Sequence, residues 1–381
     1  MSKWDTVRLG DVVTLLNGRA YKQNELLNTG KYPVLRVGNF FSNRDWYYSD
    51  LELEEDKYCD NGDLLFAWSA SFGPKIWDGE KVIYHYHIWK ILTTDRIRKD
   101  FLYYYLDNVA ERVKAEGHGI TMIHTTKAEM EERIIPIPPL ETQCKIAANL
   151  DKVTHTIDLC NAILEKLDLL VKSRFVEMFG DIYTNKHSFP IQQLADYIDF
   201  LTSGSRGWAK YCVDDGSEWF ITIKNVKDCR ISTDNIQPVN APDNMEAKRT
   251  KVEEGDLLIS ITADLGRTGV VTREIAEHGA YINQHLTCIR LDKTKLIPLY
   301  VAYFMESESG TPQFEAKNQT GVKAGLNFDS IKSLKLLVPP LALQQQFAAF
   351  VEQTDKSKLA VKQVLEKAET LKKALMQEYF G

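Results

Sequence analysis

The sequence predicts an α+β protein made of two tandem mixed domains, each followed by one long α-helix. Three observations predict it: a proline-rich phrase occurs twice, the segment after each copy has a helical period, and the segment before each copy is rich in short strand patterns. The two copies read "IPIPPLETQCKIAANL" from Ile135 and "LVPPLALQQQFAAFV" from Leu337. Self-similarity of this kind sets the architecture before any local assignment.

The repeat is a duplication without gaps in its second part. Pro138 aligns with Pro339 at an offset of 201, and 14 of the 43 positions up to Gly180 and Gly381 are identical. Weaker similarities lie upstream: "NGDLLFA" aligns with "EGDLLIS", "LRVGNF" with "ITIKNV", and "HYHIWKIL" with "NQHLTCIRL". The chain is therefore a tandem duplication of a diverged globular part and a better preserved segment.

The globular parts are expected at residues 1–137 and 181–338. Runs such as "YPVLRVGNF", "KVIYHYHIWKIL" and "AYINQHLTCIRL" are rich in β-branched and aromatic residues and are bounded by Gly, Asn, Asp or Pro, which is typical of short strands. A helical stretch follows in each half, "KDFLYYYLDNVAERVKAE" and "IPLYVAYFMESES". This mixture predicts two compact α+β domains.

The repeated segments, residues 138–180 and 339–381, are expected to be helical rods. Apolar residues recur in steps of four and three, which indicates a coiled-coil seam. In the first copy the seam comprises Ile146, Leu150, Val153, Ile157, Cys160, Leu164, Leu167 and Val171. Paired prolines suit the helix start and a terminal glycine its end.

The rods need partners for their apolar stripes. Some forty residues at 1.5 Å each make a helix about 60 Å long. In the second copy Thr354, Lys358 and Lys372 interrupt the seam. We expect the two helices to pair with each other as an antiparallel coiled coil, giving approximate twofold symmetry. The alternative is that each helix packs only on its own domain.

Composition agrees with an ordinary globular protein. The 381 residues are 44% hydrophobic and 26% charged, enough for a core in each half. No apolar run reaches the length of a membrane span and the first residues lack a secretion signal, so a cytoplasmic location without membrane contact is expected. The six cysteines form no Cys-x-x-Cys pair, which favours reduced structural thiols.

The order of domain, PPL-x-x-Q helix, domain, PPL-x-x-Q helix, with "GDLL" inside each domain, resembles the specificity subunit of type I restriction-modification enzymes across essentially the whole chain. The resemblance implies two target recognition domains, each reading half of a bipartite site in double-stranded DNA. It implies that the helices are spacers of fixed length. They would also dock two modification (methyltransferase) subunits, with restriction (helicase-nuclease) subunits completing the complex. The docking residues expected from the motif are Leu140, Gln143, Leu341 and Gln344.

The resemblance places the chemistry on partners, and the residues agree. There is no phosphate-binding glycine loop of either common form. Ile137 and Val338 precede the proline pairs, where adenine methyltransferases carry Asp or Asn. We therefore expect no enzyme activity and no cofactor on this chain, with S-adenosylmethionine bound by the modification subunit.

Two weaker catalytic or metal patterns have simpler explanations. Asp78, Glu80 and Lys81 could form part of a nuclease cluster, but the second half offers no equivalent, which favours a solvated turn. His85 and His87 could share one side of a strand and bind metal. Only His87 has a counterpart, His285, and a hydrogen-bonded histidine is favoured.

The charge balance is unusual for a DNA-binding protein. Residues 1–137 contain 18 Lys and Arg against 21 Asp and Glu, and residues 181–338 contain the same numbers. Phosphate neutralisation normally dominates DNA affinity. Either basic residues gather on one face or the partner subunits clamp the backbone while this chain reads bases. The acidic balance also leaves open a duplicated coiled-coil scaffold without DNA specificity.

Candidate DNA-binding residues follow from side-chain chemistry, since Arg reads guanine and Asn or Gln reads adenine. All are polar residues in turn-like stretches. In the first half they are Arg19, Lys22, Arg36, Asn39, Lys75, His118 and Thr121, and in the second half Arg206, Lys224, Asn225, Arg267, Gln319, Thr320 and Lys323. The alternative for each is a solvated residue or a turn former.

Overall fold

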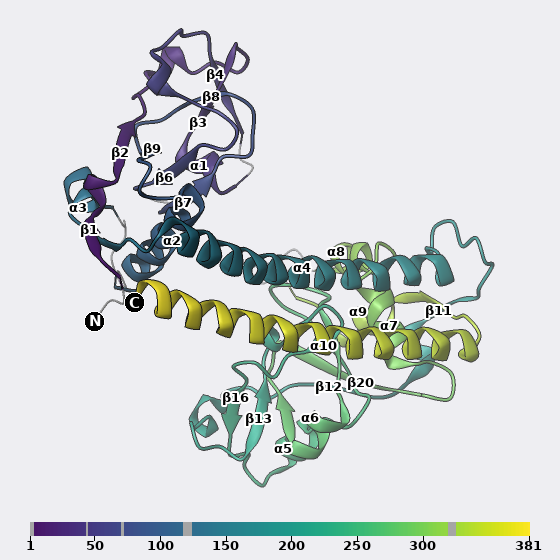
Figure 1. Ribbon diagram of the computed structural model, residues 1–381. Coiled ribbons are helices and arrows are strands. Elements are labelled where there is room, and N and C mark those ends of the chain that lie inside the picture. Colours follow the sequence, from purple (N-terminus) through teal and green to yellow (C-terminus); the bar gives the residue numbers. More distant parts are fainter. Residues whose placement is uncertain (1–3, 43–44, 70–71, 117–123, 319–324) are drawn as a thin grey trace. The chain divides into compact units, whose positions relative to one another are not determined.

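A computed structural model describes residues 4–42, 45–69, 72–116, 124–318 and 325–381 (Figure 1). The chain divides into two compact units. Unit 1 comprises residues 1–161 and 362–381, and unit 2 comprises residues 162–361. Each unit thus combines one globular part with the first part of one long helix and the last part of the other, so the units cross the predicted segment boundaries.

Unit 1 contains two four-stranded sheets and one strand pair. The antiparallel sheet has the order β2-β9-β6-β7, and the mixed sheet has the order β4-β3-β8-β5 with β3 and β8 parallel. Its strands are β1 (Thr6–Arg8), β2 (Val13–Asn17), β3 (Tyr32–Leu35), β4 (Tyr47–Ser49), β5 (Tyr58–Cys59), β6 (Leu64–Ala67), β7 (Gly73–Ile76), β8 (Val82–Tyr84), β9 (Ile88–Thr93) and β10 (Ile134–Pro136). Its helices are α1 (Val37–Phe40), α2 (Lys99–Glu116), α3 (Lys127–Glu131), the first part of α4 (Leu140–Phe179) and the last part of α10 (Leu341–Phe380).

Unit 2 repeats this plan. The antiparallel sheet β12-β20-β17-β18 matches the first sheet of unit 1, and β16-β13-β19 matches the mixed sheet, with β13 and β19 parallel. The strands are β11 (Ile191–Gln193), β12 (Ile198–Ser203), β13 (Glu218–Ile221), β14 (Val226–Lys227), β15 (Arg230–Ile231), β16 (Gln237–Val239), β17 (Leu257–Ser260), β18 (Thr268–Val270), β19 (Ala280–Ile282), β20 (Leu286–Leu291) and β21 (Lys335–Leu337). The helices are α5 (Met245–Thr250), α6 (Arg273–His278), α7 (Pro298–Met305), α8 (Thr311–Lys317) and α9 (Phe328–Lys332), together with the last part of α4 and the first part of α10.

The repeated "GDLL" phrase builds the same turn before an inner strand of each antiparallel sheet. Gly62 and Gly255 have φ values of +87° and +83°, which side chains rarely tolerate. The following aspartate closes the turn: Asp63 accepts from the backbone N–H of Asp60, and Asp256 from that of Glu253, both at 2.8 Å. The two leucines then begin β6 and β17, where they are buried.

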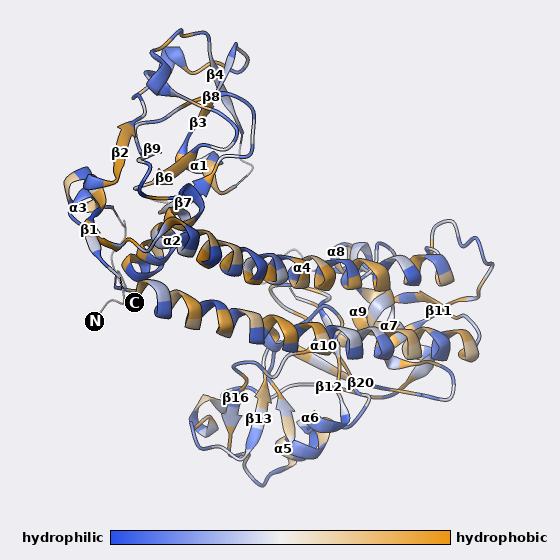
Figure 2. Ribbon diagram, viewed as in Figure 1, coloured by the Kyte–Doolittle hydropathy of each residue, from blue (hydrophilic) through white to orange (hydrophobic). Residues whose placement is uncertain are grey.

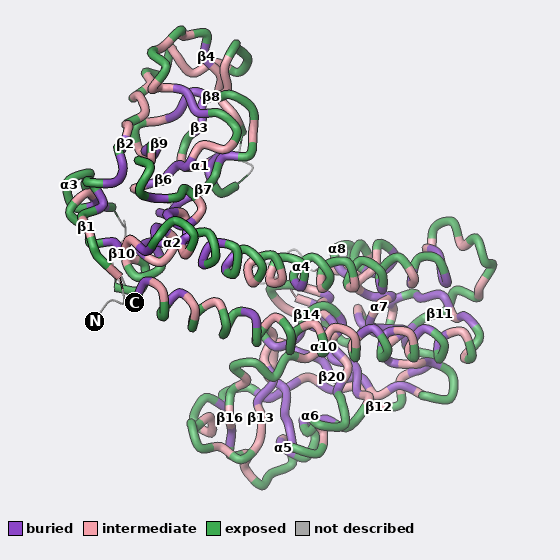
Figure 3. Tube along the Cα trace, viewed as in Figure 1, coloured by how far each residue is buried: buried purple, intermediate pink, exposed green. Residues whose placement is uncertain are grey.

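The long helices follow the predicted seam. In α4 all eight predicted seam residues are buried or half-buried, whereas Leu159, Ile163 and Leu169 are exposed. Hydrophobic residues accordingly recur along α4 and α10 in Figure 2, and exposed and buried residues alternate along the same helices in Figure 3. Two of the three polar seam residues of α10 form ion pairs, Lys358 with Asp168 and Lys372 with Asp107, and the Thr354 hydroxyl donates to Phe350 O.

The contacts inside each unit make the two helices antiparallel. In unit 1 the start of α4 and the end of α10 share one core, which contains Leu150 and Phe380. In unit 2 the end of α4 meets the start of α10, with the rings of Phe175 and Phe347 5.3 Å apart. The predicted fold class of two α+β domains with antiparallel long helices is confirmed. The alternative in which each helix packs only on its own domain is wrong.

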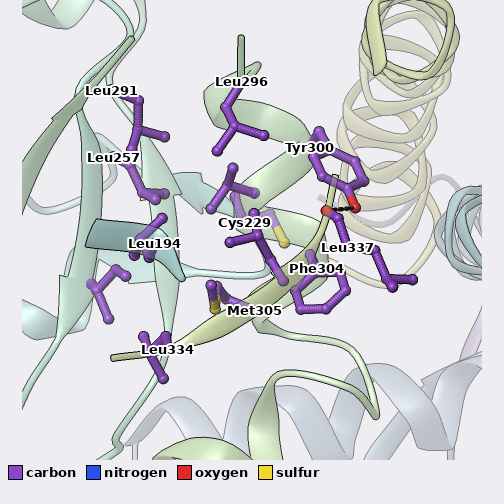
Figure 4. Close-up of a cluster of buried hydrophobic side chains, with 14 of the residues drawn as sticks. Leu194, Cys229, Leu257, Leu291, Leu296, Tyr300, Phe304, Met305, Leu334 and Leu337 are labelled. Atoms are coloured by element: carbon purple, nitrogen blue, oxygen red, sulfur yellow. Dashed lines mark hydrogen bonds between the residues drawn. The ribbon is translucent and has the colours of Figure 1, made fainter. Parts of the chain in front are cut away.

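The largest core of unit 2 joins its sheet to the helices. Leu257 and Leu291 come from the antiparallel sheet, and Tyr300 and Phe304 come from α7 (Figure 4). The buried Tyr300 hydroxyl donates to the backbone oxygen of Leu337 (2.8 Å), which satisfies the polar atom that burial would otherwise leave unpaired. The same core contains Phe347 and Val351 of α10, so the globular part of unit 2 is fixed to the helix that follows it.

Across the described parts of the chain, no helix has both the length and the apolar character that a membrane crossing requires.

Candidate nucleic-acid interface

A three-residue connection links the mixed sheet to the antiparallel sheet at the same place in each unit. In unit 1 it is His85-Tyr86-His87 between β8 and β9, and in unit 2 it is Asn283-Gln284-His285 between β19 and β20. We call these connections tip 1 and tip 2. The strands on both sides are buried, whereas the tip residues are half-buried or exposed.

The main chain of each tip is held by equivalent hydrogen bonds. The N–H of His85 donates to Leu35 O (2.9 Å), as the N–H of Asn283 donates to Ile221 O (3.0 Å). The tip also closes on itself in both units, with the Ile88 and Leu286 N–H groups each donating 3.0 Å to the first tip residue. Both tips therefore have the same backbone support.

The last tip residue is tied to the end of the neighbouring strand. In unit 1 the N–H of Trp68 donates to His87 O, and in unit 2 the N–H of Ile261 donates to His285 O, both at 3.0 Å. These strand ends follow β6 and β17, which begin at the "GDLL" turns. The duplicated phrase thus positions the rim of each tip.

A glycine beside each tip allows the close approach of the backbones. A Cβ atom on Gly18 would lie 2.4 Å from the backbone oxygens of Tyr84 and His85. On Gly204 it would lie 2.0 Å from the backbone oxygen of Asn283. Since no side chain fits at such distances, glycine is required at both positions for steric reasons.

Tip 1 is aromatic. Tyr86 is 39% exposed, and its backbone oxygen accepts a hydrogen bond from Trp68 Nε1 (2.9 Å). The Trp68 ring meets the His87 ring edge-on at 4.9 Å and stacks on Trp89 at 5.9 Å. The arrangement leaves Tyr86 as the most exposed side chain of a rigid aromatic support.

The histidines of tip 1 are neutral at physiological pH. Burial, with smaller contributions from His87 and Arg36, lowers the pKa of His85 to about 4. Burial also lowers the pKa of His87. Neutral imidazoles offer one donor and one acceptor instead of a positive charge, so these side chains suit base edges better than phosphates.

Tip 2 is an amide network. Arg206 Nε donates to Gln284 Oε1 (2.6 Å), and Gln284 Nε2 lies 3.3 Å from His285 Nε2. On its other side His285 Nδ1 lies 2.7 Å from the Thr262 hydroxyl. Because an arginine can only donate, it fixes which end of the Gln284 amide is oxygen.

Several predicted DNA-binding residues surround the tips. Arg19 forms a two-pronged ion pair with Glu25 (2.8 and 2.9 Å), and the backbone N–H of Lys22 donates to the same carboxylate (2.8 Å). The backbone oxygen of Arg19 accepts from Tyr86 N (3.1 Å). Exposed Arg36 follows Leu35, which anchors tip 1, and lies over the ring of Tyr47 at 5.1 Å.

Other predicted residues lie outside the contacts of the tips. Lys75 on β7 pairs with Asp78 (3.2 Å), and Arg267 pairs with Asp264 (2.5 Å). Lys224 is exposed in the turn that follows Ile221. Five further predictions fall outside the described residues, namely His118, Thr121, Gln319, Thr320 and Lys323.

The two asparagines at equivalent places are buried turn formers. Asn39 is 8% exposed and donates to Asp45 O (3.1 Å). Asn225 is 5% exposed and accepts from both the N–H (3.0 Å) and the hydroxyl (2.8 Å) of Thr222. The surface position that base reading requires is absent for both, which favours the turn-forming alternative.

The repeated glutamines of the helix starts are fully buried. Gln143 accepts from the N–H of Arg98 (2.8 Å) and donates to the backbone oxygens of Arg96 (3.0 Å) and Pro138 (2.8 Å). All of these bonds are internal. Gln143 therefore completes the helix start, and its buried side chain offers nothing at the surface for a partner to bind.

Gln344 makes the same three bonds in unit 2, with Ile297 N (2.9 Å), Lys295 O (3.2 Å) and Pro339 O (2.9 Å). It too is 0% exposed. Of the other predicted docking residues, Leu140 is 49% exposed and Leu341 is half-buried.

The residues at the centre of the candidate interface were not predicted from the sequence. Tyr86, Trp68 and Gln284 were not among the predicted residues, although the alignment of "HYHIWKIL" with "NQHLTCIRL" contains the signal. There the first two positions differ and the third is histidine in both copies. For the metal alternative, the described residues contain no group of three His, Cys, Asp or Glu side chains that could hold an ion.

Comparison with known proteins gives one consistent family. The model of the type I restriction modification DNA specificity domain matches residues 1–169 and 233–370. The EcoBI specificity subunit of Escherichia coli is 21% identical over 92% of this chain and 79% of its own length. The EcoKI specificity subunit of Escherichia coli K12 is 23% identical over 92% and 82%.

Solved structures agree on the fold. The type I restriction-modification S subunit from M. genitalium matches with a TM-score of 0.62 and 14% identity, covering 100% of this chain and 96% of that one. A chain from a study of complex assembly and conformational transition of the type I R-M system matches with a TM-score of 0.57 and 17% identity, covering 99% and 97%.

Proposed function

Because the chain belongs to the type I restriction modification DNA specificity family, we propose that it is the subunit that selects the DNA sequence for a type I restriction-modification complex. Unit 1 reads one half of a bipartite site in double-stranded DNA and unit 2 reads the other half. The chain supplies no catalysis and binds no cofactor; methyl transfer, with S-adenosylmethionine, and cleavage belong to the partner subunits.

One observation carries the proposal: the two units present the same backbone with different exposed side chains. His85 and Tyr86 in tip 1 correspond to Asn283 and Gln284 in tip 2. Hydrogen-bonding groups of these kinds distinguish base pairs in the major groove. Two copies of one scaffold with different readers are suited to a target with two unlike halves.

The helices supply the spacing. α4 and α10 each contain 40 residues, and their antiparallel pairing is supported by contacts in both units. Half-sites read from one face of a duplex lie about 34 Å apart, one helical turn. A fixed helix length therefore gives a fixed gap in the recognised sequence.

The modification subunits dock on the outer faces of the helices. Large apolar side chains outside the seam are exposed there: Leu159, Ile163, Leu169, Leu170 and Val176 on α4, and Leu359, Val364 and Leu371 on α10. Apolar patches of this kind commonly mark protein interfaces. Docking on these faces replaces the role that the sequence assigned to Gln143 and Gln344.

Division of labour also explains the acidic charge. The chain carries a net charge of −6, which opposes strong contact with phosphates. The partners would supply most of the phosphate contacts, while this chain supplies base contacts. Isolated, the chain is expected to bind DNA weakly, with tight binding only in the complex.

The test is a binding selection from a random duplex library with the full chain, alone and with coexpressed modification subunits. We expect enrichment of a two-part sequence with a constant gap in the complex. No enrichment with modification subunits bound would favour the duplicated scaffold without DNA specificity.

Two variants separate the parts of the proposal. Exchanging residues 1–137 for those of a relative should change one half-site only. Deleting seven residues, one heptad, from α4 should change the gap and leave both half-sites intact. A domain exchange that altered both half-sites together would contradict the modular reading.

A further inference from the structure

The geometry points to the two tips as the base-reading elements, with Gln284 reading an adenine through its amide and Tyr86 occupying the equivalent place in unit 1. This inference rests on the proposed DNA-recognition function and adds the residues and the base class. Its ligand is the major-groove edge of a base pair.

The amide of Gln284 is oriented by two hydrogen bonds, and half of its hydrogen-bonding capacity is still unused. A glutamine oxygen has two acceptor positions and its nitrogen has two hydrogens. Arg206 uses one acceptor position and His285 one hydrogen. One acceptor and one donor remain, the pair that adenine requires for contacts at N6 and N7.

The supports of Gln284 belong to the scaffold of the tip. Arg206 lies two residues after Gly204, whose close approach sets the position of tip 2. His285 is tied by its backbone oxygen to Ile261 and by its ring to Thr262. A side chain held in this way loses little freedom when it binds, which favours recognition over loose contact.

In unit 1 the same backbone arrangement presents a different side chain, Tyr86. Both backbone groups of Tyr86 are engaged, by Arg19 and by Trp68. Its side chain is exposed, and within the described residues its hydroxyl has no hydrogen-bond partner. Ala20 stands where unit 2 has Arg206, two residues after the glycine. The amide network of unit 2 is therefore missing from unit 1, and the two tips select different bases.

The first experiment changes the amide into a carboxylate. Gln284→Glu keeps the shape and can keep the partner Arg206, but it removes the donor for adenine N7 and leaves only acceptors. We expect the full complex to lose about tenfold in preference for adenine at one position of one half-site and to gain preference for cytosine, whose amino group donates.

The matched control is Gln237→Glu. Gln237 is exposed on β16 in the same unit, has no contact with tip 2 in the structure, and the substitution makes the same change of charge. It should leave the selected sequence unchanged. Equal effects of the two variants would overturn the inference, since the change would then be one of net charge.

The second experiment grafts tip 2 onto unit 1 with the triple variant Ala20→Arg, His85→Asn and Tyr86→Gln. The half-site of unit 1 should acquire the adenine preference of the other half-site, which stays unchanged. A graft that folds, as judged by an unchanged melting temperature, and keeps the original half-site would overturn the inference. If the graft does not fold, Gln284→Glu decides alone.

The two proposals fail in different ways. A complex that selects no sequence before any substitution contradicts the proposed function. A complex that selects a two-part sequence, and keeps it unchanged in Gln284→Glu, contradicts only the role of the tips.

Discussion

The two halves of the chain share their side chains at the helix starts, but at the tips they share only their backbone hydrogen bonds and the third residue. At the helix starts the side chain is the same, Gln143 and Gln344, and makes the same three hydrogen bonds. At the tips the backbone bonds are the same, while the first two side chains differ. Identical chemistry is buried, and different chemistry is presented to solvent.

This difference indicates that DNA specificity can change at the tips without loss of folding stability. A buried glutamine is tied to distant backbone groups, so any replacement leaves those groups unpaired. A tip side chain satisfies few such backbone groups, because the glycine contacts and the backbone hydrogen bonds already set the position of the tip. The scaffold can stay constant while its readers diverge.

The largest expected effect comes from removing the close approach that the tips share. Gly204→Ala would put a Cβ atom 2.0 Å from the backbone oxygen of Asn283. Separation of the strands should destabilise unit 2 by about 3 kcal/mol or more. Hydrogen exchange should lose protection at residues 280–291 and keep it at residues 82–93.

The matched control is Gly325→Ala, where the nearest atom, Ile261 O, would be 3.4 Å from the new Cβ. Gly18→Ala should produce the mirror result in unit 1. If Gly204→Ala exchanged hydrogen like the unsubstituted protein, the glycine would not be what holds the tip.

A second effect tests the buried glutamines. Gln344→Leu removes three hydrogen bonds and leaves Ile297 N, Lys295 O and Pro339 O without that partner. We expect a loss of about 2–4 kcal/mol in the free energy of unfolding, measured by urea denaturation. Gln345→Leu, at the exposed neighbour, should change it little. Equal stability of the two variants would return Gln344 to the list of possible docking residues.

The smallest effect distinguishes the tips by pH. The pKa of His85 falls from 6.5 in the unfolded chain to about 4 in the folded one. As the pH drops from 6.5 toward 4, His85 takes up a proton in the unfolded chain but not in the folded one. The contribution of His85 to folding stability is therefore fully present above pH 6.5 and is lost as the pH falls toward 4. Allowing for partial exposure, the loss is about 1 kcal/mol.

His85→Asn, which installs the residue of tip 2, should remove this part of the acid sensitivity. Thermal melting at pH 7 and pH 4.5 would measure it, with His155→Asn on the exposed surface of α4 as the control. An identical pH dependence of the two variants would show that His85 does not carry the effect.

Much of the architecture could be predicted because its signals are local. The step of four and three residues in α4 is visible in the sequence, and Ile146, Leu150 and Cys160 are buried as it predicts. The pairing of the helices was expected from the apolar stripe that each copy carries, and contacts inside each unit show its antiparallel direction. In contrast, Asn39 and Asn225 have the chemistry of base readers, and only the structure shows that both are buried.

By itself the sequence determined the duplication, the two helices and their apolar seam, because periodicity and repetition depend on neighbouring residues. Tertiary structure alone decided the composition of the tips and the role of Gln143, two of whose three partners lie 45 and 47 residues away. Gln284 becomes an oriented amide only when Arg206, 78 residues earlier, folds against it. Hydrogen bonds between segments far apart in the sequence follow no fixed spacing. The composition of the site was therefore visible only in the tertiary structure.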